Sequence, residues 1–555
     1  MALNDKTMNK QDTQKRILVA TILSFAFFVA YDLLYLQPQQ VALAEQQKQE
    51  QTMKQKQVQV TSTTSSGTAP SVVTADSKTN ITPVVKDVNK MDIISTIQTK
   101  TNTIQIDSLG RIAQVTLKGD RYVDKEGKSI KLFSALQLRP LEVRFSDPKL
   151  NEEAFKTVVV ASSKTVDASN GVVKLTLTQT LSSTVLTKVL TIYPAGNYDI
   201  DISTSTNQNY FLTAGFRPDV MADMYADHGA LLIKNDGVLT IIEDEDFDRN
   251  EEFVGMHAIS AFDRYYTTTL FNFDKNLQVT VMKNKDDSPE SFIHIMNKSK
   301  LHGYVGPKDH SDIAALDERL TDIIEYGWFT FIAKPMFVML QFIHDYVGNW
   351  GWTIVITTVL IKLVLYPLSY KGMVSMNRLK ELAPKVKALQ EKYKDDKQKA
   401  SSHMMELYKK EGANPMGGCL PILLQIPVFF ALYRVLLNAI ELKGSEWFWF
   451  IEDLTHTVSM SNLLDPYLVL PLLMGLTMYI QQKITPNQIQ DETQQKIFQF
   501  LPVIFTIFFI FFEAGLVLYW TVNNVFTVAQ QYYVNRIFAK NKIARHDAHL
   551  AQKKK

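Results

Sequence analysis

The stretch that most constrains the fold runs from Asn349 to Tyr370 and reads NWGWTIVITTVLIKLVLYPLSY. About twenty mostly apolar residues are what an α-helix needs to cross the hydrocarbon core of a bilayer. A single lysine, Lys362, lies near the middle, roughly 15 Å from Trp352 at a rise of about 1.5 Å per residue. A lysine at that depth raises the free energy of membrane insertion by about 2.5–3.5 kcal/mol, and each aliphatic neighbour lowers it by roughly 0.3–0.6 kcal/mol. The stretch is therefore expected to span a membrane in spite of its charge.

Lys362 lies in a polar stripe of this expected helix. Thr358 and Tyr366 are four residues before and after it, so the three side chains share one face. An ammonium group needs water, an anion or several acceptors, and the other apolar runs have no acid near their middle, Glu513 lying at an outer end. Two interpretations follow: a hydrated cavity around the charge, which we favour, or a structural lysine that reaches toward the membrane surface.

Loop charges set the expected topology. Residues 371–410 carry eleven Lys and Arg against five acids, whereas residues 441–465 carry one Lys against five acids. Positively charged loops remain in the cytoplasm, so the first loop is expected inside and the second outside. The sequence then predicts six membrane spans with both termini in the cytoplasm, at residues 17–36, 349–370, 418–440, 466–482, 497–513 and 515–538. The connecting loops would be 371–417 and 483–496 inside and 441–465 outside.

The first apolar run, residues 17–36, follows two basic residues and is compatible with two roles. It could be a signal peptide that is cleaved near the triplet at residues 42–44, or an uncleaved anchor. We interpret it as an anchor because it is long for a signal peptide, and because an aspartate and a proline separate it from the triplet. Residues 1–16 are then the cytoplasmic N-terminus.

Two segments of different character follow this anchor. Residues 37–90 are dominated by Gln, Lys, Ser, Thr and Ala, too poor in large apolar residues for a core, and we expect a disordered tether. Residues 91–325 change to alternation of period two: Val173, Leu175 and Leu177 fall on one face, with polar residues between them. Many such runs separated by turn signals predict an antiparallel β-sandwich outside the cytoplasm.

Residues 326–347 resemble a membrane span but are interrupted by Lys334-Pro335 and are rich in Trp and Phe. Aromatic residues favour the membrane–water interface, so we predict an amphipathic helix that lies on the outer membrane surface. The cytoplasmic loop 371–417 has apolar residues at helical spacing and should form an antiparallel helical hairpin, with a kink or restart at Pro384. The hairpin is either a packed spacer or, as we prefer, a mobile arm that receives a partner.

The basic tail, residues 539–555, also has two interpretations. It could attract acidic lipid headgroups or ribosomal RNA, or only enforce orientation. Polar groups recur inside the other apolar runs, where most such groups form hydrogen bonds between helices or face a wet cavity. These groups are Gln425, Thr506, Tyr519, Asn523, Asn524 and Gln531.

Three segments carry a resemblance to a known family. YPLSYKGMVSMNRLKELAPKVKALQEKY, NPMGGCLPILLQIPVFFALY and LPVIFTIFFIFFEAGLVLYW occur in order between about residues 327 and 538 and resemble segments of the YidC membrane protein insertases. The anchor, tether and external β-domain resemble the Gram-negative bacterial form in layout. The resemblance implies an inner-membrane protein in which five of the six spans form the core and the β-domain lies in the periplasm.

The resemblance also implies a mechanism. Family members insert and help fold nascent membrane proteins, alone or with the Sec translocon, through a hydrophilic groove with a central positive charge. By position, Thr358, Lys362, Tyr366, Gln425, Tyr519 and Trp520 would line this groove, and Ile426 and Phe429 would belong to a hydrophobic slide for the substrate helix. The sequence departs from the family in one respect, because the groove charge is commonly arginine where this chain has Lys362.

No enzyme is indicated by the sequence, and no cofactor or metal site is expected. It contains no P-loop, HExxH or GxSxG motif, and its single cysteine excludes an internal disulfide. A secondary transporter would also place polar groups at mid-membrane, but it should show repeated halves, and the spans show no internal symmetry. A membrane enzyme would need facing catalytic or metal-binding side chains, and the ten histidines offer no such set.

Overall fold

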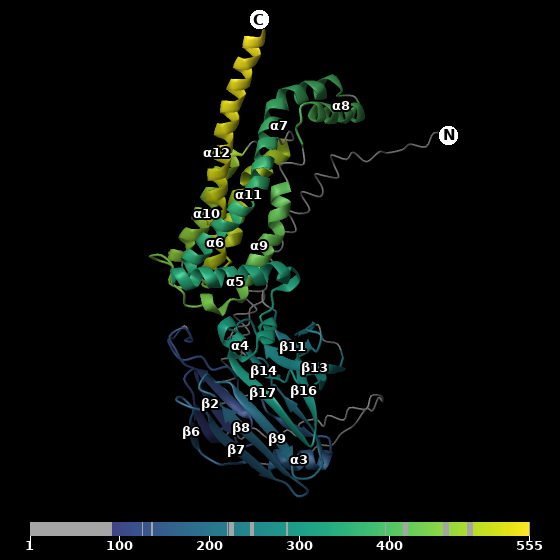
Figure 1. Cartoon of the computed structure of the whole chain (residues 1–555), viewed down its shortest axis with the longest axis vertical. Helices are drawn as coiled ribbons and strands as arrows, with labels where there is room; N and C mark the ends of the chain where they lie inside the picture. Colours follow the sequence, from purple (N-terminus) through teal and green to yellow (C-terminus); the bar gives the residue numbers. More distant parts are fainter. Residues whose placement is uncertain are drawn as a thin grey trace, which may run out of the picture. The chain divides into compact units, whose positions relative to one another are not determined.

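The described residues form a β-rich part followed by a helical part (Figure 1). The computed structural model describes residues 92–553 except 125, 135–136, 219, 221–226, 245–248, 285–286, 395, 415–419, 459–464 and 486–491. The expected cytoplasmic N-terminus, anchor and tether therefore lie outside the described residues.

Strands account for most of the chain up to residue 307. Within the described residues they are β1 Ile93–Gln98, β2 Asn102–Asp107, β3 Ile112–Leu117, β4 Val143–Phe145, β5 Val160–Ala161, β6 Thr165–Asp167, β7 Val173–Thr180, β8 Val185–Ile192, β9 Tyr198–Thr204, β10 Asn209–Thr213, β11 Gly229–Lys234, β12 Leu239–Glu243, β13 Glu251–Phe262, β14 Tyr266–Phe271, β15 Leu277–Lys283, β16 Pro289–Met296 and β17 Lys298–Pro307. One helix, α3 Pro148–Lys156, lies among them.

These strands form two sheets in the part of the chain that the structure describes. A four-stranded sheet has the order β3-β2-β1-β6, and a larger sheet runs from β4 through β10, β16, β15, β13, β14, β17, β9, β8 and β7 to β5, with β11 and β12 joined to β13. Both sheets contribute to one hydrophobic core, which includes Ile104 and Ile106 of the first sheet and Leu190 and Ile200 of the second. The two sheets thus share an interior, as the sandwich prediction requires.

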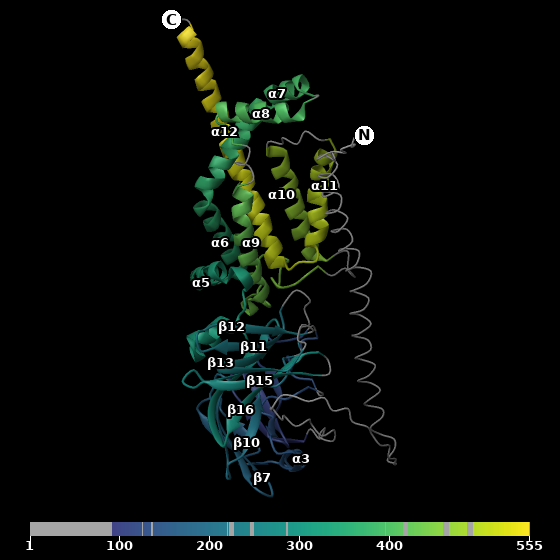
Figure 2. The same cartoon turned by 90° about the vertical axis from the view of Figure 1, so that its right-hand side faces the viewer.

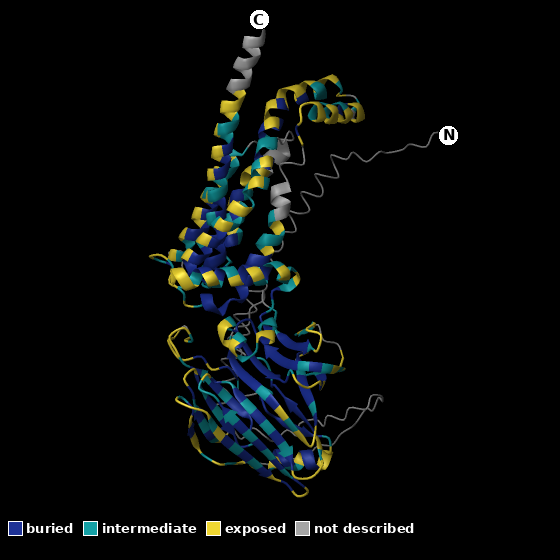
Figure 3. Ribbon diagram, viewed as in Figure 1, coloured by how far each residue is buried: buried dark blue, intermediate teal, exposed yellow. Residues whose placement is uncertain are grey.

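The alternation seen in the sequence places the core correctly. In β7, Leu175 and Leu177 are buried, and the threonines beside them are half-buried. Figure 3 shows the same alternation of buried and more accessible residues along many strands. The prediction that all strands are antiparallel is wrong at one pairing, since β1 and β6 are parallel. The reason is that β6 follows β1 only after a long connection, and such a connection allows a parallel crossover.

Helices follow the β-domain in the order α4 His310–Leu316, η2 Glu318–Ile323, η3 Gly327–Phe329, α5 Thr330–Val347, α6 Trp350–Val364, α7 Tyr366–Lys392, α8 Lys397–Lys410, α9 Leu420–Asn438, η5 Ile440–Leu442, η6 Pro466–Leu468, α10 Val469–Ile484, α11 Glu492–Phe509 and α12 Ala514–Lys553. Helix α12 packs against α6 and α10, and α11 packs on α10 (Figure 2). Helix α5 packs against α6 and α9.

The stretch 349–370 is divided between two helices. Asn349 caps α6 by accepting a hydrogen bond from the amide of Trp352, and α6 ends at Val364, six residues before the predicted end. Helix α7 then continues at an angle of 64° to α6. Pro367 in its first turn has no N–H to donate to the preceding turn, which explains the bend.

Among the described helices, none is alone both long and apolar enough to count as a membrane span, whereas α6 and α7 meet that test together as a bent pair. The C-terminal half of this pair also forms the first arm of the expected hairpin. Helix α7 runs through Pro384 without a break, and α8 returns along it, with Leu379, Leu382 and Val386 in their shared core.

Candidate functional site

Lys362 lies in the last turn of α6, where α6 packs against α12. Its side chain is buried, with the whole residue 8% exposed. Gly351, near the start of the same helix, lies so close to Trp447 that a methyl group there would be 2.1 Å from the indole ring. Trp447 thus packs closely against the start of α6, and α12 packs against the same helix.

The ammonium of Lys362 joins two other helices. Its Nζ donates to Oγ1 of Thr527 on α12 at 3.0 Å and to Oε1 of Gln425 on α9 at 3.3 Å. Nε2 of Gln425 donates in turn to Oδ1 of Asn523 at 2.6 Å, and Oγ1 of Thr527 donates to the carbonyl oxygen of Asn523 at 2.7 Å. The result is one hydrogen-bonded network across α6, α9 and α12.

All of the partners of Lys362 in this network are neutral. Within the described residues, no carboxylate lies within ion-pair distance of its Nζ. An ammonium has three N–H donors, and the two acceptors found leave one donor without a protein partner in the described part of the chain. The network therefore holds the lysine in place but does not cancel its positive charge.

The other residues of the predicted polar stripe are arranged differently. Thr358 is buried one turn before Lys362, and its hydroxyl donates to the carbonyl oxygen of Ile354 at 2.7 Å. Tyr366 falls beyond the break at Leu365, in the first turn of α7, and its ring is tilted against that of Tyr370 at 6.0 Å. A regular helix would have placed all three side chains on one face, but the bend separates Tyr366 from the α6 face.

An aromatic cluster adjoins the network. The ring of Phe429 on α9 lies 4.8 Å from Trp520 and 6.3 Å from Tyr519, both on α12. Ile426 lies one turn before Phe429 and is 42% exposed, and Phe430 beside it is 45% exposed. The structure therefore brings Phe429, Tyr519 and Trp520 together and leaves Ile426 on an open apolar face of α9.

Thr527 is the contact of Lys362 that the sequence interpretation missed. Asn523 stands out in the sequence as a polar residue inside an apolar run, whereas a threonine such as Thr527 is less conspicuous there. The two residues are four apart, so they lie on the same face of α12. This spacing of two polar groups in a predicted span was the signal that could have identified Thr527.

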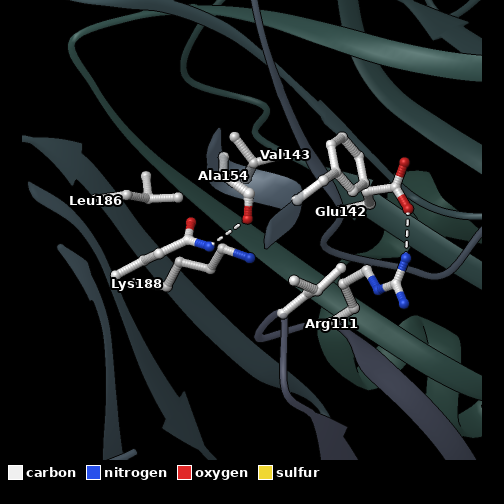
Figure 4. Close-up of a pocket in the computed structure, with 9 residues that line it drawn as sticks. Arg111, Glu142, Val143, Ala154, Leu186 and Lys188 are labelled. Carbon is white, nitrogen blue, oxygen red and sulfur yellow. Dashed lines mark hydrogen bonds and ion pairs between the residues drawn. The ribbon is translucent and has the colours of Figure 1, made fainter. Parts of the chain in front are cut away.

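A second polar cluster lies inside the β-domain (Figure 4). Nη1 of Arg111 contacts Oε2 of Glu142 at 2.8 Å, and Nζ of Lys188 donates to the carbonyl oxygens of Gly110 and Leu141 at 2.9 and 2.7 Å. Burial lowers the pKa of Lys188 to about 7. The cavity beside these groups is only about 10 Å³, enough for a single water molecule at most. The cluster is therefore part of the packed core rather than a ligand site.

The described part of the chain thus combines a large β-domain with a helical bundle that contains a buried lysine. Comparison with known families assigns both parts: residues 342–542 match the family described as 60Kd inner membrane protein, and residues 295–339 match the YidC periplasmic domain. The chain is 49% identical to the membrane protein insertase YidC of Campylobacter jejuni, over 95% of this chain and 97% of that protein. It is 45% identical to the YidC of Wolinella succinogenes, over 97% of each.

The chain therefore belongs to the YidC family of membrane protein insertases. It is an inner-membrane protein with a periplasmic domain. A solved structure described as an active YidC insertase with its first transmembrane domain resolved covers 80% of this chain and 96% of its own, at 18% identity and a TM-score of 0.36. A similarity at that level carries no further argument.

Proposed function

We propose that this chain inserts nascent membrane proteins into the inner membrane, with Lys362 as the group that attracts the polar segment of the substrate. The observation that supports this role is the ammonium with two neutral acceptors and one remaining donor. A substrate carboxylate reaching that donor would gain a charge-assisted hydrogen bond in a medium of low dielectric constant. A polar tail would then have a shorter apolar barrier to cross.

The substrate's apolar helix would leave along the exposed face of α9. Ile426 and Phe430 supply apolar surface there, and Phe429 links this face to the aromatic cluster of α12. Thr358, Gln425, Tyr519 and Trp520 would complete the groove, and Tyr366 would lie at its cytoplasmic end. The driving force would be partition of the substrate helix into lipid, without covalent chemistry.

We further propose six spans with both termini in the cytoplasm. In this topology α5 lies on the periplasmic membrane surface, and its exposed residues Phe331, Val338, Phe342 and Tyr346 form an apolar stripe directed at the lipid. The α7–α8 hairpin and the basic C-terminal helix lie in the cytoplasm, where ribosomes could contact them. We also propose that the protein acts together with the Sec translocon, and this proposal rests on its membership of the family.

Photocrosslinking of a stalled nascent chain tests the groove. A photoreactive residue at Gln425 or Phe429 should crosslink to a ribosome-bound membrane protein, and one at Val160, which is 70% exposed in the β-domain, should not. Crosslinks confined to Val160 would contradict the proposed groove. A solute flux assay in proteoliposomes addresses the secondary transporter, which the relatives do not support.

A further inference from the structure

One arginine of α9 lies outside the Lys362 network and joins this helix to the β-domain. Nη1 of Arg434, one turn before the end of α9, lies 2.9 Å from Oδ2 of Asp227 and 3.8 Å from Oε2 of Glu325. Asp227 precedes β11, and Glu325 lies between η2 and η3. The side chains of Arg434, Asp227 and Glu325 are 30%, 22% and 11% exposed. These three side chains form a clasp between α9 and the β-domain with the segment that leaves it.

The clasp and the Lys362 network hold α9 from opposite sides. Arg434 follows Gln425 by nine residues, which is about two and a half helical turns, so the two side chains leave the helix in opposite directions. Gln425 contacts Lys362. Phe430, one turn before Arg434, stacks on Phe329 with ring centroids 6.2 Å apart, and it belongs to the exposed face of α9. Because the clasp lies beside that face, it can set how the helix presents the face to a substrate.

Glu325 is the member of the clasp that titrates near neutral pH. Burial raises the pKa of its carboxyl to about 7, and the negative charge of Asp227 adds to the shift. Oε1 accepts a hydrogen bond from the amide of Gly327, and Nδ2 of Asn438 donates to the backbone carbonyl oxygen of Glu325 at 2.7 Å. Within the described residues, Oε2 of Glu325 has no hydrogen-bond partner. The clasp therefore accommodates the neutral carboxyl more readily than the carboxylate.

Three charged groups face this carboxyl: Asp227 before β11, Arg434 on α9 and the buried Lys308 after β17. Burial lowers the pKa of Lys308 to about 8, so this lysine stays mostly protonated up to about pH 7.5. The clasped state binds the proton of Glu325 more tightly than a released state whose side chain reaches water, because its pKa is raised from 4.5. This contribution is full below about pH 4.5 and is lost as pH rises to about 7. From pH 6.0 to 7.5 the ratio of released to clasped molecules should rise roughly eightfold.

We propose that Arg434 is a positioning residue for insertion and that its clasp weakens as the pH on the periplasmic side rises. While the clasp is closed, α9 keeps the orientation that directs Gln425 at Lys362 and turns its exposed face toward the substrate. Release lets the Arg434 end of α9 turn, which disturbs both arrangements at once. The inference rests on the proposed function, and it gives the β-domain a part in shaping the groove.

Hydrogen exchange of the full-length protein in nanodiscs measures the clasp directly, because release of Glu325 removes the acceptor of the Gly327 amide. After correction for the intrinsic rate, exchange in residues 325–329 should accelerate roughly eightfold from pH 6.0 to 7.5 in the wild type. Glu325→Gln keeps an acceptor oxygen without the charge and should remove this acceleration. Glu318→Gln is the matched control, since Glu318 is exposed on η2, and it should exchange as the wild type does.

The rate at which a single-span substrate inserts into proteoliposomes, measured by protease protection, tests the positioning role. The wild-type rate should fall about twofold from pH 6.0 to 7.5, because a roughly eightfold change brings a clasp that is closed about fivefold to roughly half open. Glu325→Gln should show no such fall. Arg434→Gln should insert at both pH values no faster than the wild type does at pH 7.5, and Arg434→Lys should keep the wild-type pH dependence because it keeps the charge. A thermal melt of each variant confirms folding.

The two measurements separate the possible failures. Equal exchange in the wild type and in Glu325→Gln at both pH values overturns the clasp. Exchange that follows Glu325, together with a wild-type insertion rate and pH profile in Arg434→Gln, overturns the positioning role. Full insertion by Lys362→Glu would instead overturn the groove of the proposed function, and the exchange measurement, which needs no substrate, still decides on the clasp.

Discussion

Arg264, in the turn between β13 and β14, donates to the buried carboxylate of Glu513, the residue immediately before α12. The same guanidinium donates through Nε to the carbonyl oxygen of Leu437 near the end of α9, at 2.7 Å, and lies 4.5 Å above the ring of Tyr265. One side chain of the β-domain therefore contacts α9 and the residue that precedes α12, both on the periplasmic side in the proposed topology.

Removing Arg264 should destabilise the protein strongly. Arg264→Met leaves Glu513 buried without its cation, and breaking a buried pair costs about 3–5 kcal/mol. Denaturant unfolding of the purified protein in detergent measures the change. Arg249→Met is the matched control, because Arg249 is 82% exposed and pairs with Glu251 at 3.0 Å on the surface, where a pair contributes about 0–1 kcal/mol.

Pairing Arg264→Met with Glu513→Leu should recover much of this loss, since no unpaired charge then remains. Additive losses in the double variant would show that the two side chains act independently.

The charge of Lys362 should decide insertion of substrates with acidic external tails. Lys362→Glu should abolish their insertion because the groove would repel the tail, and Lys362→Arg should retain it because the charge is kept. Complementation of a depletion strain and protease protection of a reporter substrate measure the effect. Full activity of the glutamate variant would rule out attraction by charge.

Thr527 should stabilise the protein through its hydroxyl. Thr527→Val keeps the shape but removes the 3.0 Å acceptor of Lys362, and loss of a hydrogen bond to a charged group costs about 1.5–3 kcal/mol. Thr527→Ser keeps the hydroxyl and should remain near the wild type. Thermal unfolding in detergent compares the three proteins, and equal stability of the valine and serine variants would exclude this hydrogen bond as a stabilising contact.

Glu441 should make stability depend on pH. It is buried in the loop after α9, accepts a hydrogen bond from the His310 amide at 2.9 Å, and burial raises its pKa to about 7. The folded state thus binds this proton more tightly than the unfolded state, so the contribution to stability is full below about pH 4.5 and is lost as pH rises to about 7.

Glu441→Gln keeps an acceptor oxygen without the charge. This variant should match the wild type near pH 4 and exceed it at pH 8, by an amount of the order of 3 kcal/mol. Unfolding measured at both pH values checks the prediction. A constant difference between the two proteins across this range would exclude Glu441 as the titrating group.

Local pattern predicted much of the fold, and tertiary contact explains what it missed. Alternation placed Leu175 and Leu177 in the core, because side chains of period two reach one face whatever the topology. The same alternation puts Lys188 in register with Leu186 and Leu190 in β8, where it is buried. The alternation predicts that Lys188 points into the core. A lysine is tolerated at this buried position because backbone carbonyl oxygens accept hydrogen bonds from its ammonium.

The candidate site likewise combines features that local sequence pattern predicts with contacts that only the tertiary structure shows. The position of Lys362 within an apolar run could be predicted, and so could the absence of a mid-span acid in the other runs. Its contact with Gln425 joins residues 63 positions apart and that with Thr527 joins residues 165 apart, which no local pattern specifies. The bend after Val364 was visible in principle, because Pro367 removes a hydrogen bond of the helix.

That bend has a mechanical consequence. Helix α7 begins four residues after Lys362 and continues unbroken to Lys392, so it is a rod of about 40 Å. Its far end carries the α8 arm, and its near end adjoins the lysine across the bend at Leu365. Because α7 is continuous, a displacement of the hairpin that leaves α7 straight also moves the turn of helix beside the charge.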